Sequence, residues 1–186
     1  MFSLMAKAKS AYSIPTKDGK PDTHIIVVWV DNEAGVLARV VGLFSGRGYN
    51  IESLAVAEID FKRNISRITI VTTGTPQVID QIKLQLKKLV PVHKVADFKR
   101  EDKNVIFKEM ALFKIVSSEN NIQKSLNACK TFNPVILDKT KKSAVIQITA
   151  LRREIDFMMK KLKPLGLVSA SRTGAVAMTR GADIFN

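Results

Sequence analysis

The alternation of apolar and polar positions becomes regular at Thr23 and predicts strands and helices in turn. An almost unbroken apolar run at 24–30, rich in β-branched residues, predicts a buried strand over 23–31. Beyond the polar residues that follow, apolar side chains recur at helical spacing and predict a helix over 34–47. The apolar face of this helix is made by Val36, Leu37, Val40, Val41 and Phe44. The glycines at 46 and 48 are typical of a helix C-terminus and predict that the helix ends there.

The pattern continues to residue 98 in an order that matches one known topology. Thr75 is expected to cap the second helix, with Pro76 in its first turn. The remaining elements are an alternating strand at 50–60, a polar hairpin at 61–64, a strand at 65–73 and a strand at 91–98. The resulting order, βαββαβ, is that of a ferredoxin-like domain.

A similar order follows a charged linker at 99–104. The expected elements are one strand or two short strands at 105–116, a helix at 121–132, strands at 135–138 and 143–149, a helix at 152–165, a strand at 167–171 and a last segment at 174–178. We therefore predict an α+β fold with tandem ferredoxin-like βαββαβ domains. The predicted boundaries are a flexible tail at 1–22, a first domain at 23–98, the linker, and a second domain at 105–186.

Composition narrows the class of protein. A hydrophobic content of 46% is enough for a packed core and too high for a disordered chain. The single cysteine, Cys129, rules out an internal disulfide framework, and is expected to be buried and structural because no histidine lies in its half of the chain. Two histidines and one cysteine make a zinc site improbable. Since no apolar run approaches the ~20 residues of a membrane span, we expect a cytoplasmic protein without membrane contact.

The net charge of +13 is concentrated in the second half, where residues 99–186 hold 17 Lys and Arg against 8 Asp and Glu. Such an excess of positive charge is typical of proteins that bind nucleic acid, anionic lipid or an acidic protein partner. The alternative is that the charges only form an ordinary solvated surface. An RNA-recognition domain of βαββαβ order needs aromatic side chains on its central strands. The strand at 65–73 has none, and the strand at 23–31 offers only Trp29, so nucleic-acid binding is disfavoured.

The candidate chemistry lies at the start and end of the first helix. A helix N-terminus presents unpaired N–H groups and partial positive charge to an anion. Gly35 would let a ligand approach those groups closely, while Asn32 and Asn50 each offer a donor and an acceptor. Together they suit a small zwitterion such as an amino acid. The alternative is that Asn32 is only an N-cap and Gly35 only a turn residue. The sequence holds no recognisable catalytic motif.

Residues 24–98 closely resemble a known family. The segments HIIVVWVDNEAGVLARVVGLFSGRGYNIESLAVA, SRITIV and QIKLQLKKLVPVHKVADF are similar to the small regulatory subunit of acetohydroxyacid (acetolactate) synthase, which carries an N-terminal ACT domain. The run GLFSGRGYNIESL is the most specific part. EMALFKI near residue 109 and SRTGAVAMTRG near the end extend the resemblance more weakly into the second half. The first ~22 residues fall outside it and depart from the commoner bacterial form.

The resemblance implies a regulatory subunit without catalytic residues. It would activate a large catalytic subunit and confer feedback inhibition by branched-chain amino acids, usually valine, in valine, leucine and isoleucine biosynthesis. The transferase chemistry would belong to the large subunit, with its thiamine diphosphate and magnesium and with FAD as a further candidate. This chain would hold no cofactor or metal. A free-standing ACT-domain amino-acid sensor is the alternative.

In the family, two ACT domains pair as a homodimer and bind the effector at their interface. The positions carried over are Asn32, Gly35, Val36 and Leu37 from one copy and Asn50 and Ile51 from the other. The expected contacts are the valine carboxylate with N–H groups at Gly35 and Val36, and its ammonium group with asparagine carbonyls. Val36, Leu37 and Ile51 would line the isopropyl group.

Overall fold

A computed structural model describes residues 19–100 and 102–182 of the chain. The predicted tail at 1–22 lies almost entirely outside these residues. The described chain forms two compact units, which divide at residue 100 apart from the short segment Ser53–Ala55. Each unit is an antiparallel sheet with two helices, so the predicted α+β fold with two ferredoxin-like units is confirmed. The units are described separately below.

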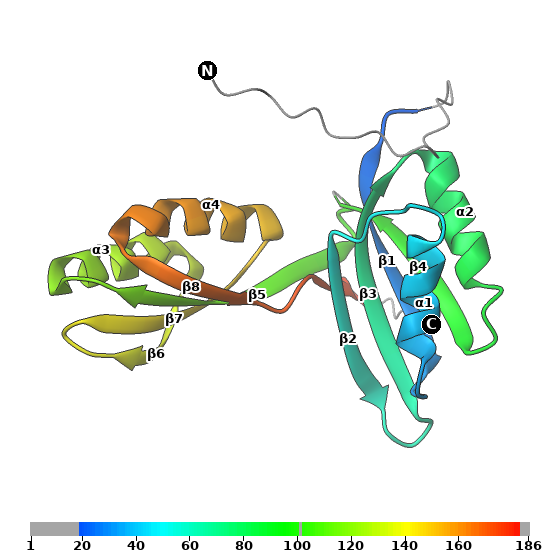
Figure 1. The fold of residues 1–186 in the computed structure, drawn as a ribbon, viewed down its shortest axis with the longest axis horizontal. Coiled ribbons are helices and arrows are strands. Elements are labelled where there is room, and N and C mark those ends of the chain that lie inside the picture. Colours follow the sequence, from blue (N-terminus) through cyan, green and yellow to red (C-terminus); the bar gives the residue numbers. More distant parts are fainter. Residues whose placement is uncertain (1–18, 101, 183–186) are drawn as a thin grey trace. The chain divides into compact units, whose positions relative to one another are not determined.

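The first unit has the predicted βαββαβ order. Its elements are β1 (Asp22–Asp31), α1 (Val36–Ser45), β2 (Ser53–Asp60), β3 (Ile65–Gly74), α2 (Pro76–Leu86) and β4 (Val92–Lys99). The strands lie in the order β2-β3-β1-β4, and β1 runs antiparallel to both of its neighbours. Both helices cover the same face of the sheet (Figure 1). The loops at the two ends of α1 therefore lie at the rim of this layer.

The core of the first unit forms between the helices and the two central strands. On β1 the residues Ile26, Val28 and Val30 share one face of the strand and are buried, and Ile25 and Val27 on the other face are buried as well. On α1 the buried set is Val36, Val40, Leu43 and Phe44. Helix α2 begins as predicted, because the Thr75 hydroxyl accepts the N–H of Val78 at 3.4 Å and Pro76 occupies the first helical position.

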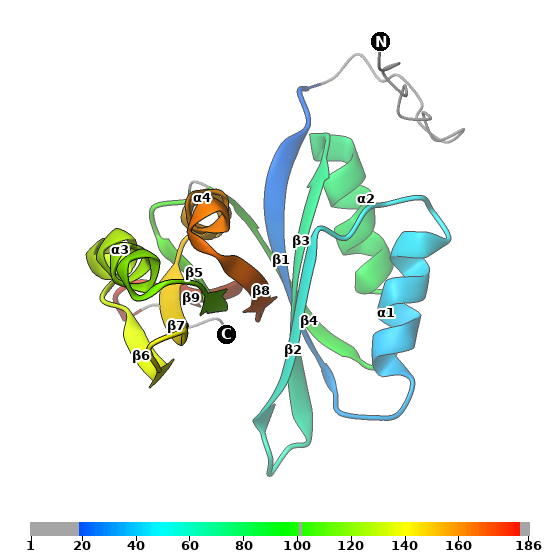
Figure 2. The ribbon, with the colours of Figure 1, turned by 60° about the vertical axis from the view of Figure 1, so that its left-hand side comes forward.

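The second unit repeats the order and adds a strand. Its elements are β5 (Val105–Val116), α3 (Glu119–Cys129), η1 (Lys130–Phe132), β6 (Val135–Lys139), β7 (Ser143–Ala150), α4 (Arg152–Leu162), η2 (Lys163–Leu165), β8 (Leu167–Arg172) and β9 (Val176–Thr179). The sheet order is β6-β7-β5-β8, and β9 pairs separately with β5. Helices α3 and α4 cover one face of this sheet (Figure 2).

Strand β5 is a single strand of 12 residues, which resolves the two possibilities left by the sequence. Its first part, Val105–Lys108, pairs with β9, and the remainder pairs with β7 and β8. Phe113 and Ile115 of β5 are fully buried in the core under the two helices. Cys129 is also fully buried there, and burial raises the pKa of its thiol to about 11, which confirms the expected structural role.

Several predicted boundaries need correction. Helix α1 covers 36–45 instead of 34–47, because Gly35 has φ 84°, outside the helical region, and the chain turns after Gly46. Strand β2 begins at Ser53 instead of residue 50. The predicted last turns of the helices in the second unit are 3₁₀ turns, η1 and η2, each ending at a residue with positive φ.

Candidate functional site at the two ends of helix α1

Helix α1 starts without a side-chain cap. Gly35 is its N-cap, with φ 84° and ψ −7°, and no side chain accepts a hydrogen bond there. The N–H of Val36 already donates to the Glu33 carbonyl at 3.3 Å. Within residues 19–100 and 102–182, no acceptor lies in hydrogen-bonding distance of the N–H groups of Leu37 and Ala38. The start of α1 therefore presents two unpaired donors and the positive end of the helix dipole.

The space beside this helix start is open. A Cβ added to Gly35 would meet no atom within 4 Å. The positive φ of Gly35, not crowding, is therefore what requires glycine at this position. Leu37 is 41% exposed, whereas Val36 is 3% exposed and its side chain belongs to the core. Of the two predicted apolar contacts from this loop, only Leu37 presents its side chain outward.

Asn32 is held by the beginning of β3 and does not cap the helix. Its backbone N–H donates to the Asn64 carbonyl at 2.7 Å, and the Asn64 side-chain amide donates to the Asn32 carbonyl at 3.2 Å. The Ser66 hydroxyl donates to Asn32 Oδ1 at 3.0 Å. The alternative in which Asn32 is the N-cap is therefore wrong, because Gly35 occupies that position.

The other predicted residues lie beyond the opposite end of α1. Asn50 is exposed, and its backbone carbonyl accepts the Thr72 hydroxyl at 2.7 Å. Its side chain has no hydrogen-bond partner among the described residues. Ile51 is half-buried. This loop thus offers a polar side chain next to an apolar one, on a backbone that is fixed by β3.

One chain does not bring the two sets of residues together. Asn32 and Gly35 precede α1, and Asn50 and Ile51 follow it. A helix of ten residues is about 15 Å long, which exceeds the reach of one valine molecule. A single chain therefore keeps the two predicted sets apart, one at each end of α1, and each set is called a half-site below.

The sequence analysis missed the residues that hold the two asparagines. Ser66 and Thr72 lie on β3, and Asn64 precedes Ser66 in the hairpin with φ 55°. The available signal was the position of Ser66 and Thr72 in the same row of the strand predicted at 65–73 as the apolar Ile68 and Ile70. That signal marks buried hydroxyls but does not name their partners.

Other polar clusters lie away from α1. In the first unit His24 Nδ1 lies 2.7 Å from Asp97. In the second, the buried Glu109 takes a two-point contact from Arg172, at 2.7 and 2.8 Å. The hydrogen bonds that Arg172 donates to Glu109 are the largest of the influences that raise the pKa of the Arg172 guanidinium. Asp156 accepts from the same guanidinium at 2.6 Å, so this cluster is internally paired.

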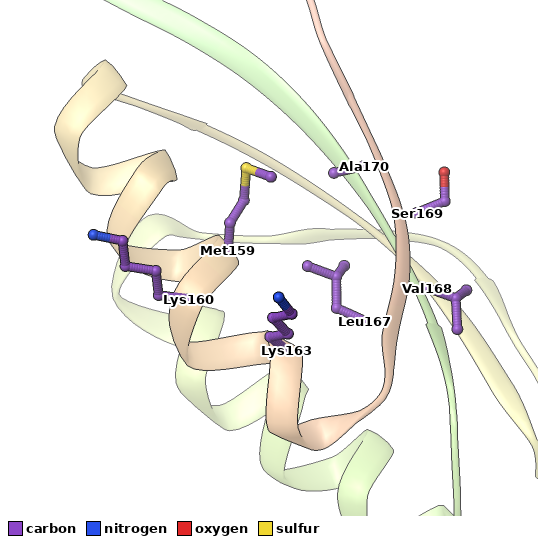
Figure 3. Close-up of a pocket in the computed structure, with 7 residues that line it drawn as sticks. All are labelled: Met159, Lys160, Lys163, Leu167, Val168, Ser169 and Ala170. Atoms are coloured by element: carbon purple, nitrogen blue, oxygen red, sulfur yellow. The ribbon is translucent and has the colours of Figure 1, made fainter. Parts of the chain in front are cut away.

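A hollow of about 370 Å³ lies in the second unit, between the end of α4 and β8 (Figure 3). Its lining residues are Met159, Lys160, Lys163, Leu167, Val168, Ser169 and Ala170. Met159 and Leu167 extend into the space between helix and strand, and Lys160 points away from the strand (Figure 3). The lining includes two lysines, Lys160 and Lys163, and no acid, histidine or cysteine.

A membrane-spanning helix and a cluster of metal ligands are both absent from the part of the chain that the structure describes. Among the described residues, no helix has both the length and the apolar character needed to cross a bilayer. No group of three or more His, Cys, Asp or Glu side chains lies close enough together to hold a metal ion in the same part of the chain.

Comparison with known proteins matches both halves of the chain to one family. A family model described as AHAS small subunit-like ACT domain matches residues 26–94. A second, described as small subunit of acetolactate synthase, matches residues 108–181. The small subunit from Mycobacterium bovis is 34% identical over 161 residues, 87% of this chain and 94% of that one. The small subunit from Aquifex aeolicus is 37% identical over 90% of this chain and 86% of its own length.

A solved structure agrees with these matches. The crystal structure of the acetolactate synthase small subunit from Thermotoga maritima is similar with a TM-score of 0.78 and 33% identity, covering 87% of this chain and 99% of that one. The ferredoxin-like units define an ACT-domain protein. More particularly, the chain belongs to the acetolactate synthase small-subunit family.

Proposed function

We propose that the chain is the regulatory subunit of an acetolactate synthase and binds L-valine between two copies of its first unit. One copy contributes the start of α1, with Asn32, Gly35 and Leu37. The other contributes the end of α1, with Asn50 and Ile51. The observation that carries this proposal is the separation of the two half-sites by the length of α1, because two copies are then needed to surround one small ligand.

The contacts of the ligand follow from the groups that each half-site leaves unpaired. The valine carboxylate takes the N–H groups of Leu37 and Ala38 at the positive end of α1. Of the two donors expected from the sequence, the Val36 N–H already has a partner, whereas the Gly35 N–H has none among the described residues and stays in the proposed contact set. The ammonium group takes the side-chain carbonyl of Asn50, which is exposed and without a partner among the described residues. Leu37 and Ile51 line the isopropyl group.

The catalytic steps belong to a large subunit in this proposal. The relatives are small subunits. In this proposal thiamine diphosphate and magnesium, with FAD as a further candidate, belong to the large subunit. Valine bound between two copies would favour the dimer geometry for which its affinity is higher, and the large subunit would respond to that geometry. This mechanism requires a ligand-dependent change in the dimer, not a catalytic group in this chain.

A two-part experiment tests the proposal. L-valine is titrated into the full chain by calorimetry and thermal melting, with D-valine as the control. We expect saturable binding, with one L-valine molecule for each pair of half-sites. We also expect the Tm to increase at millimolar L-valine, since a ligand that binds the native state stabilises it. The chain is then assayed with its cognate large subunit, where activation without valine and inhibition with valine are expected.

Each part has a result that contradicts the proposal. Absence of L-valine binding to the full chain contradicts the effector site. Binding of L-valine without association with any thiamine-dependent large subunit would indicate a free-standing sensor instead. Size-exclusion chromatography of the mixture separates these outcomes.

A further inference from the structure

Strand β3 carries two buried hydroxyls in a row that is otherwise apolar. Its helix-facing positions are Ser66, Ile68, Ile70 and Thr72. The next residue of the same row is Gly74, where an added Cβ would lie 2.9 Å from the Val78 side chain of α2, so this row faces the helices. Ser66 is 5% exposed and Thr72 is 1% exposed. A buried hydroxyl costs free energy unless it is hydrogen-bonded, so each needs a partner.

The partners of the two hydroxyls are the two asparagines of the proposed effector site. Ser66 donates to Asn32 Oδ1 at 3.0 Å, and Thr72 donates to the Asn50 carbonyl at 2.7 Å. The first contact is at the start of α1 and the second is beyond its end. One strand therefore contacts both half-sites, with an apolar segment between the two contacts.

We propose that Ser66 and Thr72 are positioning residues for the effector, one for each half-site. Ser66 fixes the side-chain amide of Asn32 in the loop that leads into α1. Thr72 fixes the backbone of Asn50 and with it the direction of the exposed side chain. Groups held in place before binding lose less conformational entropy when the ligand arrives, which increases affinity. The proposal rests on the proposed function, since it concerns the same site.

The same strand offers a matched control. Thr69 is also buried, at 5% exposure, and lies between the two positioning residues. Its side chain points to the opposite face of the sheet, where its position pairs with Val27. It therefore shares burial, strand and chemistry with Thr72 but contacts neither asparagine.

The first test compares single variants of the full chain. Ser66→Ala and Thr72→Val each remove one hydroxyl, and each is expected to weaken L-valine binding about two- to tenfold, as loss of one hydrogen bond would. Thr69→Val is expected to leave the Kd unchanged. Ser66→Thr and Thr72→Ser keep a hydroxyl and are expected to stay within about twofold of the original Kd. Tm is measured for every variant, so that a loss of affinity is compared with any loss of stability.

The second test uses the composite nature of the site. In a dimer of one Ser66→Ala chain and one Thr72→Val chain, one site carries both defects and the other carries none. Statistical mixing makes about a quarter of all sites intact, although neither homodimer has one. We therefore expect the mixture to bind L-valine with a high-affinity component at the original Kd. Native mass spectrometry confirms that mixed dimers have formed.

The possible failures are distinct. If the unchanged chain binds no L-valine, the proposed function is wrong and this inference falls with it. If the unchanged chain binds L-valine but Ser66→Ala and Thr72→Val bind it as well as Thr69→Val does, the inference is wrong and the function stands. If both variants weaken binding but verified mixed dimers show no high-affinity component, the assignment of the two hydroxyls to opposite halves of one site is overturned.

Discussion

Helices α1 and α3 occupy the same place in their two units, yet they begin in opposite ways. Helix α3 follows Ser118, whose hydroxyl accepts the Asn121 N–H at 3.5 Å, and has Glu119 in its first turn. Helix α1 follows Gly35 and has neither a side-chain cap nor an acidic residue in its first turn. Since the topology is shared, the difference lies in the few residues that precede each helix.

The same fold therefore has a capped helix N-terminus in the second unit and an uncapped one in the first. A cap and an acid satisfy the N–H groups and the dipole of α3 within the chain. The same groups of α1 are left for a ligand, which is the basis of the proposed effector site. The second unit also pairs its buried Glu109 internally, with Arg172. Variants in the second unit should therefore change stability, and variants at the start of α1 should change binding.

The largest effect is expected from Arg172→Met. It leaves the Glu109 carboxylate buried without its cation, which should cost about 3–5 kcal/mol of the free energy of unfolding. Urea denaturation followed by circular dichroism measures the loss. The double variant Glu109→Gln with Arg172→Met removes both charges and should recover part of the stability. If Arg172→Met is as stable as the original chain, the Glu109 carboxylate is hydrated by water and does not need the cation.

The next effect is expected from Gly35→Asp, which places a carboxylate where the ligand carboxylate is proposed to bind. Like charges in close contact cost several kcal/mol, so the Kd for L-valine should increase about a hundredfold or more. Gly35→Asn is the matched control, because asparagine has nearly the same size and the same tolerance of positive φ without the charge. Equal Kd values for the two variants would contradict the placement of the carboxylate.

Much of the fold followed from the sequence because its signals are local. Thr75 with Pro76 marked the start of α2, and the strand expected at 65–73 corresponds to β3. The boundaries of α1 were less accurate, since they depend on the φ of Gly35, which the sequence does not specify. The identities of the proposed effector residues came from a family resemblance, and their placement as contacts stays a prediction.

The environment of each candidate site residue depends on tertiary packing and could not be predicted. Val36 and Leu37 are adjacent in the sequence, but the turn of the helix places Val36 in the core and Leu37 at the surface. The contact between Asn32 and Ser66 joins residues 34 positions apart. Helical periodicity and motif spacing contain no information about such a contact.

A smaller effect is expected from Ser118→Ala. Removal of this N-cap should cost about 0.5–1 kcal/mol of the free energy of unfolding, without a change in the Kd for L-valine. Thermal and urea denaturation measure the first quantity, and calorimetry measures the second. Thr75→Ala, the equivalent change at α2 in the first unit, provides a comparison of caps between the units. A change in valine affinity in Ser118→Ala would show that the helix starts of the two units are not independent.

The effect that is smallest at neutral pH concerns the thiol of Cys129, because it develops only as the pH rises above about 8.5. Burial raises its pKa to about 11, whereas a thiol in the unfolded chain ionises near 8.5. The folded state therefore retains a proton that the unfolded state loses, and this contribution to stability should decline as the pH rises from about 8.5 to about 11. Urea denaturation across this range should show a steeper decline for the original chain than for Cys129→Ala. Parallel curves would mean that the thiol titrates alike in both states.

The pairing of β5 with β9 has a consequence for folding during translation. The sheet of the first unit uses no strand beyond Lys99, so it can form while the ribosome is still producing the remainder of the chain. The opening residues of β5, Val105–Lys108, find their partner only when Val176–Thr179 has left the exit tunnel. A nonsense mutation before Val176 is therefore expected to release a chain with a folded first unit and an incomplete second unit.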